Sequence, residues 1–475
     1  MQKRKTKIVA TLGPASNSVD MITQLIETGV NVFRLNFSHG HADDHRSAVK
    51  KIREAAKQSG KIIGILQDLQ GPKIRVGVFE DGVVELQEGA DFILHCDHDR
   101  PGDVDGVSVT YTDLYQDLTQ GSHVLLDDGR LELQVTHIEN QQIHTRVVRG
   151  GELSNNKGIN VPGADLSISA VTEKDITDLR LGAELNVDWV ALSFVRSQDD
   201  LLLARQYMEE FGSTAKLMAK IEKPGAVRNY KKILKTADGI MVARGDLGVE
   251  LSPEQVPMLQ KRLIRKAREK GKPVVTATQM LESMISNTMP TRAEANDVAN
   301  AIFDGTDAVM LSAETAAGRY PVQAVQMMDT IAITVESDKD YIKRMQDRKV
   351  ITEKNTPDSV SAAACQIANN LDVKVITCFS SSGATALRVA RNRSATPVIA
   401  ISPSKRSCQQ LTVSWGVNPV LAEDAHDSDE MVQIANQVIK QQEAARPGSR
   451  FVVTAGVPFG VSGTTNLIRV ERVQS

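Results

Sequence analysis

Charged residues stand inside short apolar segments of this chain, where a solvated surface residue is not expected. Lys220 and Glu222 lie two positions apart in the run Met218–Glu222, and Asp246 follows the next apolar run. Residues two apart in a strand point to the same side, so both side chains face a common space. Two carboxylates beside a cation suit a hard divalent ion that also contacts substrate oxygens. A plain Lys–Glu–Asp salt-bridge network fits the same spacing.

Other polar residues also close apolar runs. They are Arg34, Asn36, Asp68, Arg244, Thr278, Ser312 and Glu314. Any one of them, taken alone, is better explained as the solvated start of a loop. A charge within an apolar run is harder to explain in that way, because an unpaired buried charge costs several kcal/mol. The set therefore indicates a functional site at the ends of the runs.

Eight short apolar runs, each followed by a helical pattern, would position these residues. They are Lys7–Leu12, Val30–Phe37, Ile62–Asp68, Trp189–Phe194, Leu217–Glu222, Gly239–Gly245, Val274–Thr278 and Ala308–Glu314. Nearly continuous apolar runs are typical of parallel strands that are covered on both faces, and eight such units close a (β/α)₈ barrel. A doubly wound open sheet is the alternative. The predicted barrel spans residues 1–70 and 166–340.

An inserted segment, residues 71–165, has a different texture. Alternating strand patterns are separated by the turn sequences Glu80–Gly82, Asp127–Gly129 and Glu139–Asn140, which are typical of β-hairpins. The insertion follows a barrel strand, and loops at that position line the catalytic face of barrel enzymes. We therefore predict a β domain that acts as a lid.

A charged linker, Ser337–Pro357, precedes a last domain at residues 350–475. Three further strand-then-helix units begin at Lys374–Phe379, Pro397–Ile401 and Phe451–Ala455. They predict a separate C-terminal α/β domain.

Composition excludes some classes of function. The chain has 475 residues, a net charge of −3 and 4% aromatic residues, so neither nucleic acid nor membrane is an expected partner. The cysteines, Cys96, Cys365, Cys378 and Cys408, form no metal-binding or disulfide pattern. Reduced thiols and the absence of a long apolar segment predict a cytoplasmic protein.

Four segments carry a resemblance to a known family. They are Phe33–Gly40, Ala219–Glu222, Met241–Gly248 and Ala277–Met284. In this order they resemble the signature stretches of pyruvate kinases, and the likeness extends over essentially the whole chain, including the insertion and the terminal domain. The resemblance implies a glycolytic enzyme that transfers the phosphoryl group of phosphoenolpyruvate to ADP, giving pyruvate and ATP.

The resemblance also implies roles for individual residues. Glu222 and Asp246 would hold Mg²⁺ or Mn²⁺, and Lys220, with Arg34, would stabilise the phosphoryl group in flight. Thr278, with Ser312, would take part in protonating the enolate. The substrate would also meet the backbone at Ala243, Arg244, Gly245 and Asp246, at the opening of a helix. The nucleotide would lie near Pro14, Arg34, Asn36, His39, Arg75, Asp128 and Lys157.

A monovalent-ion site is the one place where the sequence departs from the family pattern. K⁺ ligands of the family match Asn36, Ser38, Asp68 and the carbonyl of Leu69, but Lys73 replaces an acidic residue of the K⁺-requiring members. A lysine ammonium is itself a compact monovalent cation. We predict that Lys73 supplies this charge and that K⁺ is not required; a solvated surface lysine is the alternative.

The terminal domain carries a candidate regulatory site. A hydroxyl-rich turn opens a helix after a strand, and two cations follow the next strand; the residues are Ser380, Ser381, Ser382, Gly383, Thr385, Lys405 and Arg406. Spacing alone also fits an ordinary α/β turn. The resemblance favours a sugar-phosphate or nucleotide effector and a homotetramer.

Two other functions fit part of the pattern. Barrel aldolases and lyases also use a divalent metal and an arginine to stabilise a pyruvate enolate, but they need no nucleotide lid. A degenerate scaffold that binds only an effector would not need an intact Lys220, Glu222, Asp246 and Thr278.

Overall fold

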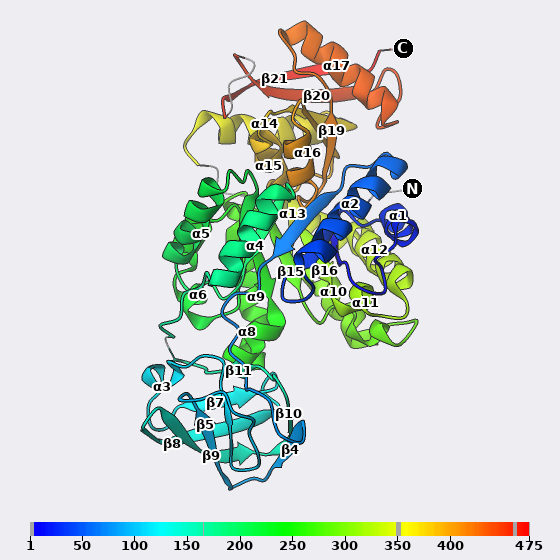
Figure 1. The fold of residues 1–475 in the computed structure, drawn as a ribbon. Helices are drawn as coiled ribbons and strands as arrows, with labels where there is room; N and C mark the ends of the chain where they lie inside the picture. The colour runs from blue at the N-terminus through cyan, green and yellow to red at the C-terminus, as the bar shows by residue number, and fades with distance from the viewer. Residues whose placement is uncertain (1–3, 165, 348–352, 459–462, 475) are drawn as a thin grey trace.

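The computed structural model describes residues 4–164, 166–347, 353–458 and 463–474. Its three parts follow one another in space: the barrel lies between a lid of strands at one end and an α/β domain at the other (Figure 1). The predicted domain limits at residues 165 and 350 lie outside the described residues, so the boundaries stay a prediction.

The central part is a closed barrel in which all neighbouring strands are parallel, as the sequence predicted. The strand order around the barrel is β1-β16-β15-β14-β13-β12-β3-β2. Each predicted apolar run supplies one strand: β1 Lys7–Thr11, β2 Val32–Asn36, β3 Gly64–Asp68, β12 Trp189–Leu192, β13 Lys216–Ile221, β14 Gly239–Ala243, β15 Val274–Ala277 and β16 Ala308–Leu311.

Helices cover the outside of the barrel. Its strands are therefore buried on both faces, which explains why they are apolar throughout. The principal ones are α1 Val19–Thr28, α2 Ala42–Ser59, α4 Glu173–Glu184, α5 Gln198–Glu210, α7 Tyr230–Thr236, α9 Val256–Glu269, α10 Arg292–Asp304 and α12 Pro321–Ser337. Thr172 and Thr291 start α4 and α10 with reciprocal capping boxes, which satisfy backbone amides that a helix leaves free. Inside the barrel, Met218, Met241 and Val275 form a separate core that Val413 of the C-terminal domain joins.

Short helical segments occupy several loops after barrel strands. They are α6 Pro224–Arg228, α8 Arg244–Glu250, α11 Ala313–Ala316 and the 3₁₀ turns η1 Pro253–Gln255 and η2 Glu282–Ile285. Helix α8 begins directly after β14, which turns the chain sharply at the carboxyl end of that strand.

The lid consists of a six-stranded sheet in the order β11-β7-β8-β9-β5-β6 and a pair, β10-β4. Its elements are β4 Val83–Leu86, β5 Asp91–His95, β6 Gly106–Ser108, α3 Leu114–Asp117, β7 His123–Leu126, β8 Leu131–Glu139, β9 Gln142–Arg149, β10 Gly151–Ser154 and β11 Ile159–Asn160. Asp127, Asp128 and Asn140 have positive φ angles, as tight turns between strands require. Two of the three predicted turns join hairpins, β7–β8 and β8–β9, whereas Glu80–Gly82 precedes β4, which pairs with β10.

The C-terminal domain is a five-stranded sheet in the order β19-β18-β17-β20-β21, with only β21 antiparallel. Its elements are α14 Thr356–Asn370, β17 Val375–Phe379, α15 Ala384–Ala390, β18 Val398–Ser402, α16 Lys405–Leu411, β19 Val417–Leu421, α17 Ser428–Gln441, β20 Arg450–Gly456 and β21 Thr465–Arg472. The sequence predicted β17, β18 and β20 but missed both edge strands.

The predicted linker also contains an element that the sequence did not predict, helix α13 Lys339–Asp347. Six of its nine residues are polar, which hid the helix, but Tyr341 and Met345 are buried against the barrel core. No helix in the described part of the chain is both long and apolar enough to cross a membrane. All four cysteines are free and buried.

Candidate active site

Lys220 lies at the centre of a charged group at the carboxyl ends of the barrel strands. Its Nζ atom is 3.1 Å from Oδ1 of Asp68 and 3.0 Å from Oε1 of Glu222. It also donates a hydrogen bond of 2.7 Å to Oγ of Ser193. Side chains from three neighbouring strands or their ends therefore meet at one mouth of the barrel.

The charges of this group shift one another's pKa values. Burial alone would lower the pKa of Lys220, but the carboxylates of Asp68, Glu222 and Asp246 outweigh it and raise that pKa. Burial raises the pKa of Glu222, and the nearby Asp246 raises it further, against the effect of Lys220. The ammonium is therefore held charged, while two carboxylates lie close enough to repel each other. A cation placed between Glu222 and Asp246 would relieve that repulsion.

Arg34 adds a second cation to the same mouth. Its Nε donates to Oδ2 of Asp68 over 2.6 Å and its Nη1 to Oγ1 of Thr11 over 3.1 Å. The two cations lower the pKa of Asp68, although burial by itself would raise it. A single buried carboxylate thus holds both Arg34 and Lys220 in place. With Glu222 and Asp246 the mouth has three carboxylates for two cations, so a bound divalent cation would give it an excess of positive charge for an anionic ligand.

Ser193 and Phe194 take part in the site, although the sequence analysis did not select them. Ser193 Oγ donates to the carbonyl of Leu69 over 2.7 Å while accepting from Lys220, and the Phe194 amide donates to Glu222 over 2.7 Å. Phe194 has a φ of +55°, which is unusual for a bulky residue. Their position at the end of the fourth apolar run was the signal that could have identified them.

Thr278 has a strained backbone beside the start of helix α8. Its φ is +66°, a conformation that β-branched residues rarely adopt. Its Oγ1 accepts a hydrogen bond of 2.8 Å from the Gly245 amide and donates one of 2.7 Å to the Ala277 carbonyl. The strain places this hydroxyl at the amide-rich turn that was predicted to bind the substrate.

Arg244 uses its side chain to hold that turn. Its Nη1 contacts both carboxylate oxygens of Asp297 at 2.7 and 2.6 Å, and its Nη2 donates to the Thr278 carbonyl over 2.6 Å. Only the backbone amide of Arg244 remains for the predicted substrate contact. Ala243, also predicted to contact the substrate, is the buried last residue of β14, and Asp246 follows in the first turn of α8.

Ser312 and Glu314 close the site from β16. Glu314 accepts from the Ser312 amide over 2.6 Å and from the Leu281 amide over 3.1 Å, so it ties the loops after β15 and β16 together. Burial raises the pKa of this carboxyl. The Oγ of Ser312 is buried and has no hydrogen-bond partner among the described residues. A buried hydroxyl without a partner is uncommon and is a place where a substrate or water can be bound.

The predicted monovalent-ion ligands lie on adjacent strands. Asn36 and Asp68 are register partners at the ends of β2 and β3, and Asn36 Oδ1 accepts from the Ser38 amide over 3.2 Å. Lys73 is exposed and makes no ion pair within the described residues. It stands at the start of the lid rather than among the four ligands.

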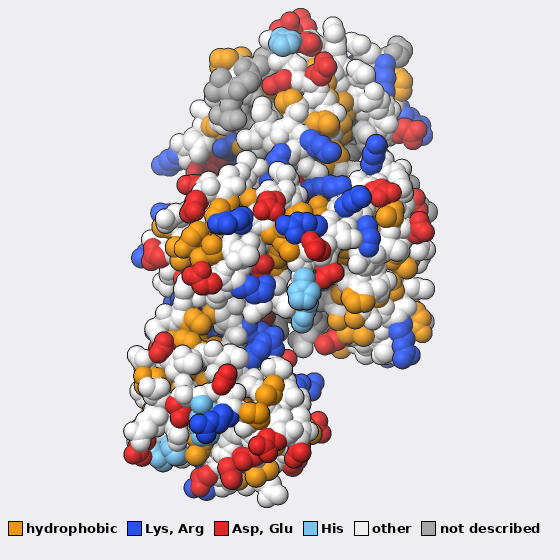
Figure 2. Space-filling model, viewed as in Figure 1, with side chains coloured by type: hydrophobic (Ala, Val, Ile, Leu, Met, Phe, Trp, Pro, Cys, Tyr) orange, Lys and Arg blue, Asp and Glu red, His pale blue; other side chains and the backbone are white. Residues whose placement is uncertain are grey.

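A narrow cleft separates the barrel mouth from the lid. Lys73 and Asp128 line it from the lid side, and Phe194, Lys223 and Asp246 line it from the barrel side. A hollow between the two parts is visible in Figure 2. Two of the predicted lid residues therefore face the same cleft as a predicted metal ligand.

The lid is joined to the barrel by a contact that the sequence did not reveal. Asn160 donates to Oε1 of Glu250 over 2.8 Å, and Lys223 contacts the same oxygen at 2.5 Å. Because Glu250 is buried, this charge-assisted contact is stronger than an exposed ion pair.

The remaining predicted nucleotide residues lie in the lid and in the loops after β1 and β2, and none of them lines this cleft. Arg75 donates to the Asn156 carbonyl over 2.8 Å, and Lys157 pairs with Asp127 at 2.8 Å, so both are held within the lid. Pro14 and His39 are exposed after β1 and β2. Of the predicted nucleotide residues, only Asp128 lines the cleft, so a common nucleotide site for the whole set stays a prediction.

The predicted effector residues are only partly assembled. Ser380, Ser381, Ser382, Gly383 and Thr385 form one turn, in which Thr385 contacts Thr465 at 2.7 Å. Lys405 is exposed. The guanidinium of Arg406 does not bind this hydroxyl-rich segment. It donates a hydrogen bond of 2.8 Å to the Asn186 carbonyl and forms an ion pair of 3.4 Å with Asp188. Its guanidinium therefore joins the C-terminal domain to the barrel.

Comparisons with known proteins agree with this arrangement. The family model described as the pyruvate kinase barrel domain matches residues 3–325, and the one described as the pyruvate kinase alpha/beta domain matches residues 358–471. Pyruvate kinases of the Staphylococcus aureus strains MRSA252, USA300 and NCTC 8325 are each 44% identical over 472 residues, which cover 99% of this chain and 80% of the relative. The chain belongs to the pyruvate kinase family of phosphotransferases.

Proposed function

We propose that this enzyme transfers the phosphoryl group of phosphoenolpyruvate to ADP at the barrel mouth, with Lys220 as the central catalytic cation. The observation that carries the proposal is the position of Lys220, which is held charged between Asp68 and Glu222 beside Asp246. Phosphoryl transfer needs positioning and positive charge around the moving group more than it needs covalent chemistry. The intact charged mouth disfavours a scaffold that binds only an effector.

Glu222 and Asp246 fit a divalent metal. They offer hard oxygen donors, and the Asp246 carboxylate raises the pKa of Glu222 and so disfavours its charged form, an effect that a bound cation would oppose. Mg²⁺ accepts this donor set, and Mn²⁺ does as well. Such an ion supplies charge stabilisation to the substrate oxygens when it is bound.

Transfer and protonation are separate steps. In the first, the bond between phosphorus and the enol oxygen breaks and a bond to a β-phosphate oxygen of ADP forms, with Lys220 and Arg34 beside the moving group. In the second, the enolate carbon takes up a proton. The Thr278 hydroxyl takes part in delivering this proton. The Ser312 hydroxyl is the second candidate for this role, because its Oγ has no hydrogen-bond partner in the described part of the chain.

The substrate carboxylate binds at the turn before and within the start of helix α8. The amides of Ala243, Arg244, Gly245 and Asp246 lie there, and the Gly245 amide now donates to Thr278. A substrate carboxylate at this turn would accept the hydrogen bond of the Gly245 amide and so release the Thr278 hydroxyl from it. The hydroxyl would then become available for protonation only after the substrate has bound.

The lid supplies the nucleotide side. We assign ADP and ATP to the cleft between Asp128 and Asp246, with Pro14, Asn36, His39, Arg75 and Lys157 around it. A closing lid excludes water from a reaction in which water would compete with ADP. The barrel aldolases and lyases lack this requirement, so the lid favours the kinase.

Lys73 is proposed to replace K⁺. Asn36, Ser38, Asp68 and the Leu69 carbonyl are the matching ligand types. Lys73 lines the cleft between the lid and the barrel and makes no ion pair in the described part of the chain. Its ammonium would supply the missing monovalent charge when the lid closes. A phosphorylated effector at the turn 380–385 and a homotetramer also remain proposals, and these have support from family likeness alone.

One coupled assay tests the proposed reaction. Pyruvate formation is followed from phosphoenolpyruvate with and without ADP and with and without Mg²⁺. A kinase needs both additions and forms one ATP for each pyruvate. Pyruvate formed at the same rate without ADP would contradict the proposal and favour a lyase or phosphatase.

A further inference from the structure

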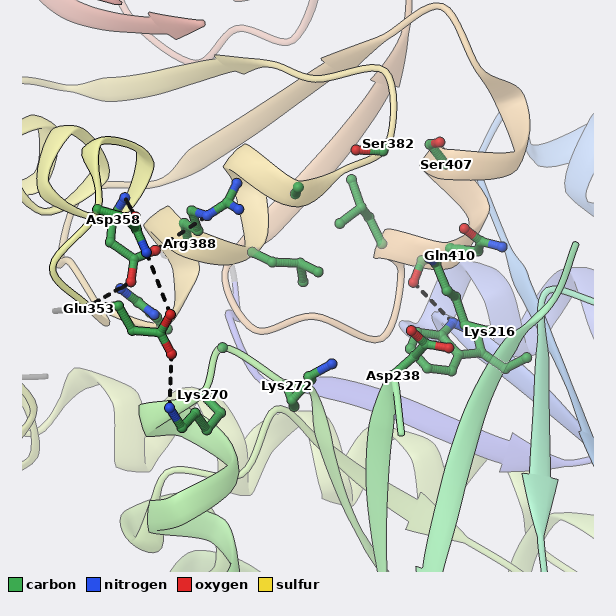
Figure 3. A pocket seen from close by; sticks show the side chains of 17 residues that line it. Lys216, Asp238, Lys270, Lys272, Glu353, Asp358, Ser382, Arg388, Ser407 and Gln410 are labelled. Carbon is green, nitrogen blue, oxygen red and sulfur yellow. Dashed lines mark hydrogen bonds and ion pairs between the residues drawn. The ribbon is translucent and has the colours of Figure 1, made fainter. Parts of the chain in front are cut away.

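The lid carries an unusual share of the histidines of this chain. A cavity between the barrel and the C-terminal domain, lined by Lys216, Lys272 and Arg388 (Figure 3), also contains Ser382 and so belongs to the effector turn already described. The lid lies at the other end of the molecule from that domain (Figure 1). Five of the nine histidines of the chain fall between residues 71 and 165, and histidine side chains are visible on the surface of the lid in Figure 2.

Three potential metal ligands meet at the end of strand β5. His95 is the last residue of this strand, and Asp97 and His98 lie two and three residues further on. The ligand atoms of these side chains lie within 4.8 Å of one another, and no second group of this kind occurs within the described residues. Oδ1 of Asp97 is 3.6 Å from Nδ1 of His95 and 4.0 Å from Nε2 of His98. One carboxylate oxygen therefore stands close to both imidazole rings.

The separations from Asp97 suit a tetrahedral dication. Zn²⁺ binds imidazole nitrogen at about 2.0–2.1 Å and carboxylate oxygen at about 2.0–2.2 Å, so neighbouring ligand atoms of a tetrahedral site lie roughly 3.3–3.5 Å apart. The two separations from Asp97 exceed this range by about half an ångström at most. Asp97 and His98 follow the strand rather than lie within it, and a small rotation of their side chains would close this gap.

His95 offers a nitrogen that no other group uses. Its Nδ1 is buried and has no hydrogen-bond partner among the described residues, which is uncommon for a buried polar atom. The tautomer with its proton on Nε2 leaves the lone pair of Nδ1 available to a metal. Strand β5 lies between β9 and β6, and His95 is in register with Gln142 and Ser108. One ligand is thus fixed on a rigid element of the lid.

Neighbouring groups orient the other two ligands. The Gln142 side chain donates to Oδ2 of Asp97 over 3.5 Å, which leaves Oδ1 directed toward the rings. The Arg100 amide donates to Nδ1 of His98 over 3.2 Å, and the two imidazole rings stack with their centroids 4.5 Å apart. Such outer contacts are typical of metal ligands. Binding through Nε2 of His98 moves the ring proton to Nδ1, so it gives up the hydrogen bond from Arg100, which limits the affinity.

The surrounding sequence favours a cation and excludes a thiol ligand. Successive side chains of a strand point to opposite faces, so Cys96 is directed away from this group and is buried in the core of the lid. Residues 97–105 contain four aspartates and only one cation, Arg100. This local surplus of negative charge attracts a dication.

We propose that His95, Asp97 and His98 bind one Zn²⁺ ion, which fastens the loop 96–105 to the sheet of the lid. Two imidazoles and one carboxylate suit Zn²⁺ better than Mg²⁺, which prefers oxygen donors. Mn²⁺ lies at the weak end of the affinity series for such sites, so it favours the oxygen donors of Glu222 and Asp246. The site goes beyond the proposed kinase reaction, and its binding can be measured without that reaction.

The ion would stabilise the lid and take no part in the chemistry. Loop 96–105 connects β5 to β6, the parallel pair at one edge of the lid sheet. None of the three ligands lines the cleft between the lid and the barrel. An ion that binds only the folded chain raises its stability by mass action. Zn²⁺ should therefore raise the midpoint of thermal unfolding in the parent protein.

Zn²⁺ binding can be measured on the full chain by isothermal titration calorimetry, with Mg²⁺ in large excess to occupy the oxygen donors of the barrel mouth. The ligand variants are Asp97→Asn and His98→Gln. The matched control is His137→Gln/His144→Gln, because these two rings also stack in the lid, with centroids 4.1 Å apart, but belong to no three-ligand group in the described part of the chain. Circular dichroism checks that each variant is folded, and crystals of the parent soaked in Zn²⁺ give the position of the ion by anomalous diffraction.

The parent should bind one equivalent of Zn²⁺ that each ligand variant binds more weakly. Loss of a residue that merely orients a metal ligand costs about 10–100-fold in affinity, so loss of a ligand should raise the Kd by at least about tenfold. The control should leave the Kd unchanged, and all variants should keep the parent kcat with Mg²⁺. The proposal is overturned if the parent binds no Zn²⁺ in excess Mg²⁺, or if the folded ligand variants bind it as tightly. Loss of binding in the control alone, or an anomalous peak only elsewhere, also overturns it.

Discussion

Replacing Lys220 with glutamine removes the cation on which the charged mouth depends. The change leaves Asp68 and Glu222, whose side chains are 2% and 1% exposed, without the ammonium that lies about 3 Å from each. Breaking a buried ion pair in this way costs about 3–5 kcal/mol of stability. A cation that stabilises the transferring phosphoryl group contributes about 10³–10⁵ in kcat. We expect both losses in the same variant.

The loss of stability in Lys220→Gln should depend on pH, and the pKa of Glu222 determines whether the loss grows or shrinks as the pH rises. Its folded pKa is raised above the unfolded value of about 4.3, so the folded state holds the proton more strongly and loses stability as pH rises through this window. Without Lys220 the pKa of Glu222 rises further. Urea unfolding should therefore show a larger difference between variant and parent at pH 8 than at pH 5.

Lys223→Gln is the matched control. Lys223 is partly buried to the same extent as Lys220 and pairs with one carboxylate, Glu250, at 2.5 Å, but it has no ion pair with Asp68 or Glu222. The control should lose stability while keeping most of its kcat in the coupled assay at saturating ADP, although KM for ADP can rise because Lys223 lines the cleft. Equal kcat losses in both variants, or a Lys220→Gln enzyme that retains parent kcat, would refute the reasoning.

Other variants test the lid, the monovalent charge and the effector turn. Asn160→Ala removes the hydrogen bond to Glu250. A hydrogen bond to a charged group is worth about 1.5–3 kcal/mol, so KM for ADP should rise roughly tenfold. An unchanged KM would show that the contact plays no part in lid closure. Lys73→Glu should make activity depend on KCl, whereas a parent enzyme that itself requires KCl would contradict the role of Lys73. Ser381→Asp should abolish activation by phosphorylated effectors that bind the turn, and a full response to all of them would count against that site.

Periodicity and motif order made the barrel and its charged mouth predictable from the sequence. Parallel strands that are buried on both faces give continuous apolar runs, and all eight runs became strands of the closed barrel. Lys220 and Glu222 stood out because charges inside such runs need partners. Their meeting with Asp68 follows from closure of the barrel, which brings β3 and β13 close on either side of β12.

The features that the sequence did not reveal depend on edges, strain or tertiary partners. Strand β19 contains Pro419 and lies at a sheet edge, where a proline is tolerated but weakens the strand pattern. The positive φ of Thr278 is imposed by the surrounding loops and has no sequence signal in a β-branched residue. Arg406 resembles a phosphate ligand in sequence, yet the neighbouring domain supplies Asp188 as its partner.

Anomalous diffraction from crystals grown with Mn²⁺ and a phosphoenolpyruvate analogue tests most directly where the metal and the phosphate bind in the site. Our account predicts a single strong peak between the carboxylates of Glu222 and Asp246, with the analogue phosphate facing Lys220. A peak only elsewhere, for example at the group of His95, Asp97 and His98 in the lid, would contradict it. So would an analogue phosphate that does not contact Lys220.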